Sequence, residues 1–82
     1  MGRSGMDLEQ FNKLMKRCSD SYGVRYVSPT IHPGFRMIVS IVIDTDKESV
    51  EFNCTNNPDE NYNLNEEVNR FLDGLGGEDN AQ

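Results

Sequence analysis

Tryptophan is absent from this 82-residue chain, histidine occurs once, and basic residues are few. Eight Lys and Arg stand against fourteen Asp and Glu, which gives a formal net charge of −6. Domains that bind nucleic acids usually carry the opposite sign, because they neutralise phosphates. No apolar run approaches the roughly 20 residues that a membrane-spanning helix needs. We therefore expect no direct nucleic-acid contact, no membrane span and, as the default, a cytoplasmic protein.

Groups that commonly hold metals or perform catalysis are also scarce. The two cysteines, Cys18 and Cys54, are far apart in the sequence, and a zinc site needs about four ligands. His32 is the only histidine, and no Ser or Cys nucleophile accompanies it in a recognised pattern. We expect no cofactor, no metal and no enzymatic activity. Both cysteines fall on apolar faces, which predicts buried thiols and leaves a disulfide between them open.

Two segments have the period of an amphipathic helix. Residues 7–22 repeat apolar residues at spacings of three and four, and Asp7 with Gln10 fits a capping box. A second helix should begin near Asn63 or Asn65 and end at about Leu75, before two glycines. Their apolar stripes are Leu8, Phe11, Leu14, Met15, Cys18 and Tyr22, and Leu64, Val68, Phe71, Leu72 and Leu75.

Three strands are expected between the helices, at about residues 24–28, 35–43 and 48–55. The turns "HPGF" and "DTDK" separate them. Pro29 cannot donate to a sheet ladder, so the first strand should be an edge strand or end there. The order αβββα predicts a two-layer α+β fold, with a three-stranded antiparallel meander and both helices packed on one face.

The chain should form a single domain over residues 7–75. We expect residues 1–6, "MGRSGM", to be a remnant of an expression tag and exclude them from the fold. Residues 76–82 should form a flexible acidic tail.

The middle strand, "FRMIVSIVID", has apolar residues on both faces. Strict alternation turns one set toward the helices: Phe35, Met37, Val39, Ile41 and Ile43, joined by Val50, Phe52 and Cys54. It turns Ile38 and Val42 toward the opposite, uncovered face. We predict that this pair is an apolar contact site for a second chain, self or foreign. The alternative is that the loop of residues 56–65 folds back over it.

Charge is unevenly distributed along the chain. Residues 1–36 carry six basic and three acidic side chains, a net +3, whereas residues 37–82 carry two basic and eleven acidic ones, a net −9. The alternating acids of "DTDKE" lack the glycine and the closing glutamate of an EF-hand loop, so we favour partner binding over a cation. The acids expected to contact a basic partner are Asp44, Asp46, Glu48, Glu51, Asp59 and Glu60.

In its order of elements, size and charge, the segment 7–75 resembles small acidic inhibitors encoded by phages, in particular anti-CRISPR proteins that mimic DNA. This resemblance rests on no motif and assigns no residue. It implies a non-enzymatic protein whose acidic surface binds and blocks or regulates a basic partner protein, for example one that binds nucleic acid. The alternative is a structural or regulatory homo-oligomer, such as a homodimer, assembled through the uncovered sheet face.

Overall fold

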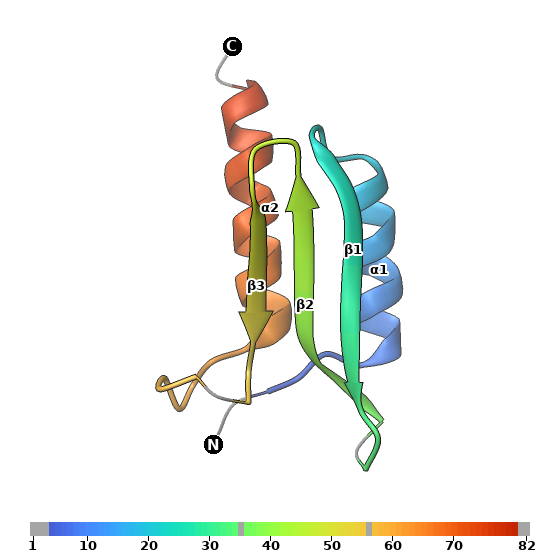
Figure 1. Ribbon diagram of the computed structural model, residues 1–82. Helices are drawn as coiled ribbons and strands as arrows, with labels where there is room; N and C mark the ends of the chain where they lie inside the picture. The colour runs from blue at the N-terminus through green and yellow to red at the C-terminus, as the bar shows by residue number, and fades with distance from the viewer. Residues whose placement is uncertain (1–3, 35, 56, 81–82) are drawn as a thin grey trace.

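The computed structural model describes the backbone of residues 4–34, 36–55 and 57–80, and the side chains of these residues up to Leu75. Along the chain, one helix precedes three strands and a second helix follows them (Figure 1). In chain order the elements are α1 (Leu8–Ser19), β1 (Val24–His32), β2 (Met37–Thr45), β3 (Ser49–Asn53) and α2 (Leu64–Asn80).

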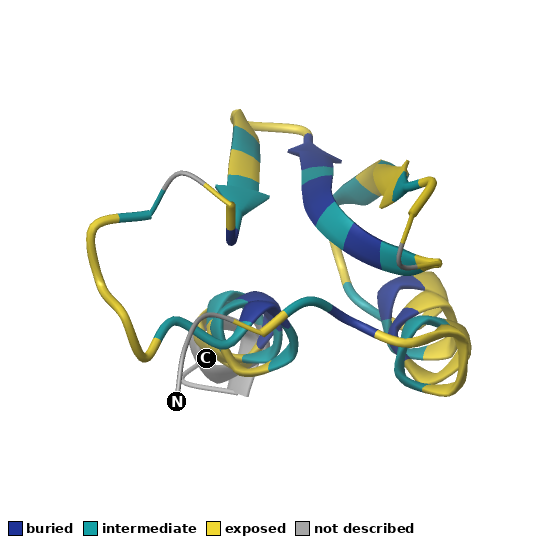
Figure 2. Cartoon of the chain, turned by 90° about the horizontal axis from the view of Figure 1, so that it is seen from below, coloured by how far each residue is buried: buried dark blue, intermediate teal, exposed yellow. Residues whose placement is uncertain are grey.

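The three strands form one antiparallel sheet in the order β1-β2-β3, and both helices lie on the same side of it (Figures 1 and 2). This confirms the predicted α+β fold. The core fills the space between the sheet and the helices. Its buried residues are Met6, Leu14, Cys18, Ile38, Ile41, Ile43, Cys54, Leu64, Val68 and Leu72.

Helix α1 begins as predicted and ends earlier than predicted. The Asp7 carboxylate accepts a hydrogen bond from Gln10 N at 2.8 Å, and the Gln10 side chain accepts one from Asp7 N at 3.1 Å. This reciprocal pair satisfies two donors that the first turn would otherwise leave open. The helix ends at Ser19, and Gly23 leads into β1 with a φ of 86°, a value that glycine adopts without strain.

Only part of the predicted α1 stripe is buried. Leu14 and Cys18 belong to the core, whereas Leu8, Met15 and Tyr22 are 63%, 38% and 76% exposed. Tyr22 lies beyond the end of the helix, and Leu8 lies in its first turn. The sheet therefore covers a narrower face of α1 than the sequence indicated.

The N-terminal segment, Ser4–Met6, is part of the fold, so its exclusion was wrong. Met6 is fully buried and exchanges two backbone hydrogen bonds with Ile38, at 2.8 and 2.9 Å. Ser4 N donates to Tyr62 O at 2.8 Å, and Leu64 N donates to Ser4 O at 2.9 Å. The segment thus joins the start of β2 to the start of α2. Residues 1–3 lie outside the described part of the chain.

A β-bulge at Val39 reverses the expected orientation of Ile38. Thr30 pairs with Ser40, but the next residue of β1, Ile31, pairs with Ile38, so Val39 has no partner on β1. An extra residue shifts the alternation of a strand by one. Ile38 therefore faces the core and is 2% exposed. The prediction that Ile38 points away from the helices is wrong.

Most other helix-facing assignments of the sheet agree with the structure, but Met37 and Val50 are only half-buried and are not among the described residues that form or contact the core. Ile41, Ile43 and Cys54 are core residues, and Val39 and Phe52 pack against them. The Phe52 ring meets the ring of Phe71 on α2 edge to face, with centroids 5.5 Å apart. Phe35 lies outside the described residues.

Helix α2 starts where the sequence indicated and runs farther. Asn63 Oδ1 accepts a hydrogen bond from Glu66 N at 3.0 Å, which caps the first turn. The helix continues to Asn80 through Gly76 and Gly77, because glycine weakens a helix without breaking its hydrogen-bond ladder. The side chains of the predicted acidic tail, residues 76–82, lie outside the described part.

Cys18 and Cys54 are both buried, and neither belongs to a disulfide. The prediction of buried thiols is confirmed. Burial raises the pKa of the Cys18 thiol, and the nearby Arg17 opposes this effect only in part.

Candidate protein-binding surface

The face of the sheet opposite the helices is open, and it is polar. Because Ile41 and Ile43 point into the core, the alternate residues of β2 and their cross-strand neighbours form the open face. Val42, half-buried, is the one aliphatic residue among them. The three rows of this face are Tyr26, Asp44 and Ser49; Ser28, Val42 and Glu51; and Thr30, Ser40 and Asn53.

Asp44 lies within this face and is engaged inside the protein. It is 8% exposed because side chains of both neighbouring strands flank the central strand. Ser49 Oγ donates to Asp44 Oδ1 at 2.5 Å, and Arg25 Nε lies 3.0 Å from Oδ2 as an ion pair without hydrogen-bond geometry. Arg25 is the unpaired residue of a second β-bulge, which turns it toward Asp44. The prediction that Asp44 is a surface contact is therefore wrong.

The other five predicted acids are exposed but do not form one cluster. Asp46 and Glu48 lie in the β2–β3 connection, and Asp59 and Glu60 lie in the loop after β3, at the opposite end of the strand (Figure 1). The five residues of β3 span roughly 13 Å. Glu51 stands between the two groups and accepts a hydrogen bond from Ser40 Oγ at 3.3 Å. The acids therefore follow a line along β3.

The backbone of β3 also has hydrogen-bonding groups that point away from the described part of the sheet. Thr45 N donates to Glu48 O at 2.8 Å, and Cys54 N donates to Val39 O at 3.0 Å. Residues of an antiparallel strand alternate between bonding their neighbour and pointing away from it. The sheet ends at β3, so the intervening residues direct their N–H and C=O groups to the open edge. These residues are Ser49, Glu51 and Asn53.

The opposite edge of the sheet, on β1, is interrupted by proline. Pro29 stands opposite Ile41, a residue of β2 that bonds toward β3. By the same alternation Pro29 occupies an outward-pointing position, where its missing N–H leaves no gap in the ladder. An edge proline also prevents another strand from pairing continuously along β1. No residue of β3 is a proline.

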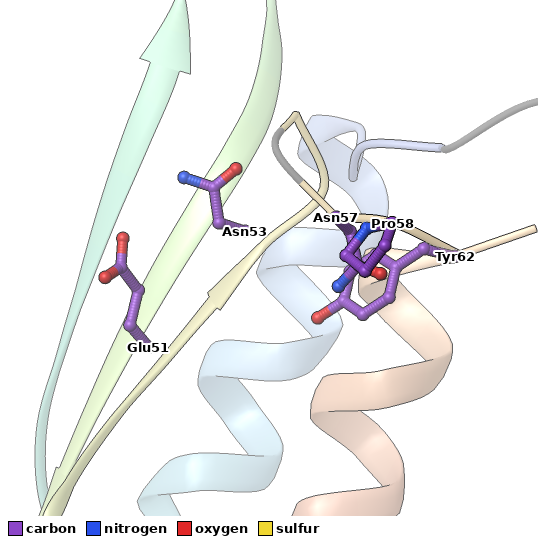
Figure 3. A pocket seen from close by; sticks show the side chains of 5 residues that line it. All are labelled: Glu51, Asn53, Asn57, Pro58 and Tyr62. Carbon is purple, nitrogen blue, oxygen red and sulfur yellow. The ribbon is translucent and has the colours of Figure 1, made fainter. Parts of the chain in front are cut away.

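A shallow pocket of about 360 Å³ lies between β3 and the loop that follows it (Figure 3). Glu51 and Asn53 extend from the strand, and Asn57, Pro58 and Tyr62 come from the loop. Tyr62 packs partly against the core, and burial, with the nearby Glu67 and Cys54, raises the pKa of its hydroxyl. The lining has one carboxylate, one aromatic ring and no basic group.

The segment that contains β3 and the loop after it carries negative charge only. From Glu48 to Asn69 the sequence contains six acidic residues and no Lys, Arg or His. Glu67 pairs with Arg70 at 2.9 Å, and Asp73 pairs with Arg17, so part of the charge on α2 is neutralised. Of the described ion pairs, none involves the exposed acids of the hairpin, of β3 or of the loop.

A second exposed region, on α1 and β1, was missed by the sequence reasoning. Leu8 and Ile31 are 63% and 54% exposed, and they border an apolar groove of about 240 Å³ with Pro33, Arg36 and Ile38. The sequence predicts a first strand that ends at about residue 28, whereas β1 runs to His32 and includes Ile31. Because an edge strand can contain a proline, the apolar Ile31 two residues after Pro29 was the available sign that the strand continues.

Within the described residues there is no helix long and apolar enough to cross a membrane. The same part of the chain has no group of three or more His, Cys, Asp or Glu side chains that could hold a metal ion. No family model, curated protein or solved structure matches the chain.

Proposed function

We propose that this chain is a non-enzymatic interaction protein that binds a basic surface of a partner protein through the acidic side of its sheet. The observation that carries the proposal is the line of acids along β3, from Glu48 through Glu51 to Asp59 and Glu60, without a basic residue among them. Such a surface attracts a cationic partner and orients the encounter. Blocking a partner that uses a basic groove for nucleic-acid phosphates is the mode of action that we favour.

The structure gives less reason for the alternative, a homo-oligomer joined through the open sheet face. It depended on Ile38 and Val42 as a neighbouring apolar pair, and Ile38 is a core residue. One half-buried valine amid polar side chains does not make the apolar centre that stable interfaces usually have.

The proposal can be tested with poly-lysine as a defined basic probe. Neutralising three members of the line of acids, with Glu48→Gln, Glu51→Gln and Asp59→Asn together, should weaken binding about tenfold, because exposed ion pairs each contribute a modest amount. Binding of the unmodified protein should also weaken steeply as salt rises toward 1 M, where the screening length falls to about 3 Å.

A matched control removes three acids from elsewhere on the molecule. Glu9→Gln, Asp20→Asn and Asp73→Asn change the net charge equally and leave β3 and the acidic stretch from Glu48 to Asn69 intact. This variant should bind poly-lysine nearly as well as the unmodified protein. Equal weakening by the two triple variants would show that net charge alone drives binding, and the proposed surface would be wrong.

A further inference from the structure

We infer that the open edge of β3 binds an extended, basic segment of the partner as an additional strand of the sheet. One Lys or Arg side chain of that segment would occupy the pocket between β3 and Tyr62. This inference rests on the function proposed above and specifies the form of the partner that the acidic surface recognises.

The backbone of β3 offers the groups that strand addition requires. Ser49, Glu51 and Asn53 each direct an N–H and a C=O away from β2. An incoming strand can pair with this row, as in other cases of β-augmentation. The β1 edge lacks a donor at Pro29, so β3 is the better edge for a continuous pairing.

Charge selects a foreign basic strand over a second copy of this chain. Antiparallel pairing of two β3 strands about a two-fold axis at Glu51 would place the two Glu51 side chains opposite each other. Like charges in directly opposed positions destabilise a strand pair. The acids at both ends of β3 would add to the repulsion between two copies. A strand with Lys or Arg at alternate positions would instead be attracted to Glu51 and to these acids.

The pocket supplies a site for one basic side chain. Figure 3 shows Glu51 and Asn53 on β3, with Pro58 and the Tyr62 ring on the facing loop. A Lys or Arg side chain that enters the pocket can lie against Pro58 and the Tyr62 ring. A cation near an aromatic face is attracted by the negative face of the ring.

The test uses a dye-labelled peptide of about ten residues with alternating Lys and Thr, long enough to span β3. Fluorescence anisotropy measures its affinity for the full chain at about 0.01 M salt, where screening is weak. A second peptide has the same residues but methyl groups on alternate backbone nitrogens, which removes donors along one edge. The methylated peptide should bind more weakly, by about 2- to 12-fold for each hydrogen bond that is lost.

A matched pair of variants tests the same contact from the protein side. Glu51→Gln and Glu51→Pro both remove the carboxylate, but only the proline removes the outward N–H. Pro29 shows that this fold accepts proline at an outward edge position. We expect Glu51→Pro to bind the unmethylated peptide about 2- to 12-fold more weakly than Glu51→Gln. Far-ultraviolet circular dichroism checks that both variants fold. If Glu51→Pro does not fold, the comparison of the methylated and unmethylated peptides still tests strand addition.

The possible results separate the two proposals. If both peptides bind equally and Glu51→Pro equals Glu51→Gln, strand addition is wrong, while the acidic binding surface stands. If neither peptide binds at low salt, both proposals are wrong. Selective loss with the methylated peptide supports both.

Discussion

Replacing Met6 by alanine should destabilise the protein strongly, although Met6 stands outside every helix and strand. Its side chain is fully buried in the core, beside the start of β2. Truncating a buried methionine to alanine costs about 2–5 kcal/mol, because apolar burial is lost and a cavity remains. For a chain of this size the total free energy of unfolding is about 4–12 kcal/mol. Met6→Ala should therefore remove a large fraction of it.

Met15→Ala is the matched control, because it makes the same chemical change on an exposed part of α1. Met15 is 38% exposed, and alanine is a better helix former than methionine. We expect its effect on the free energy of unfolding to stay within about 0.5 kcal/mol, as is usual for surface substitutions.

Urea unfolding followed by circular dichroism measures both variants. With a slope of about 1–3 kcal/mol per M, the unfolding midpoint of Met6→Ala should fall by at least about 0.7 M. A midpoint within experimental error of the unmodified protein would refute the assignment of Met6 to the core. It would also restore the view that the N-terminal segment lies outside the fold.

Three further predictions concern the backbone, a helix cap and a buried thiol. Gly5→Ala should destabilise the protein by more than about 1 kcal/mol, since its Cβ would lie 2.7 Å from Ile38 O. Gly74→Ala should instead stabilise α2 by about 0.5–1 kcal/mol in thermal unfolding, because among the described residues its Cβ would meet no atom within 4 Å other than the backbone of its own helix. Asp7→Ala should cost about 1 kcal/mol in urea unfolding, because it removes the capping box; an unchanged midpoint would contradict the cap. Burial raises the pKa of Cys18, so the folded state keeps a proton that the unfolded chain releases, and the free energy of unfolding should fall as the pH rises above about 8.5. Cys18→Ser should reduce that pH dependence, and an identical dependence in both proteins would disprove the cause.

Patterns within single segments predicted the elements and several of their ends. The capping pair of Asp7 and Gln10, the start of α2 at Asn63 and the edge position of Pro29 all depend on neighbouring residues. Each is a local property of the chain, so the sequence contains the necessary information.

The features that the sequence did not predict depend on contacts between segments that are distant in the chain. The bulge at Val39 arises from the register between β1 and β2, and the alternation of β2 alone gives no sign of it. It placed Ile38 in the core and removed half of the predicted apolar contact. The burial of Asp44 likewise depends on neighbours from both flanking strands, and Ser4–Met6 is too short to show a period.

Amide hydrogen exchange along β3, measured by NMR with and without the Lys/Thr peptide, tests the central claim most directly. In the free protein the N–H groups of Ser49, Glu51 and Asn53 face the open edge and should exchange fast. The peptide should slow these three and leave the outward N–H of Val27 on β1 unchanged. Slowing at Val27 instead, or unchanged exchange along β3 under saturating peptide, would contradict the assignment of β3 as the binding edge.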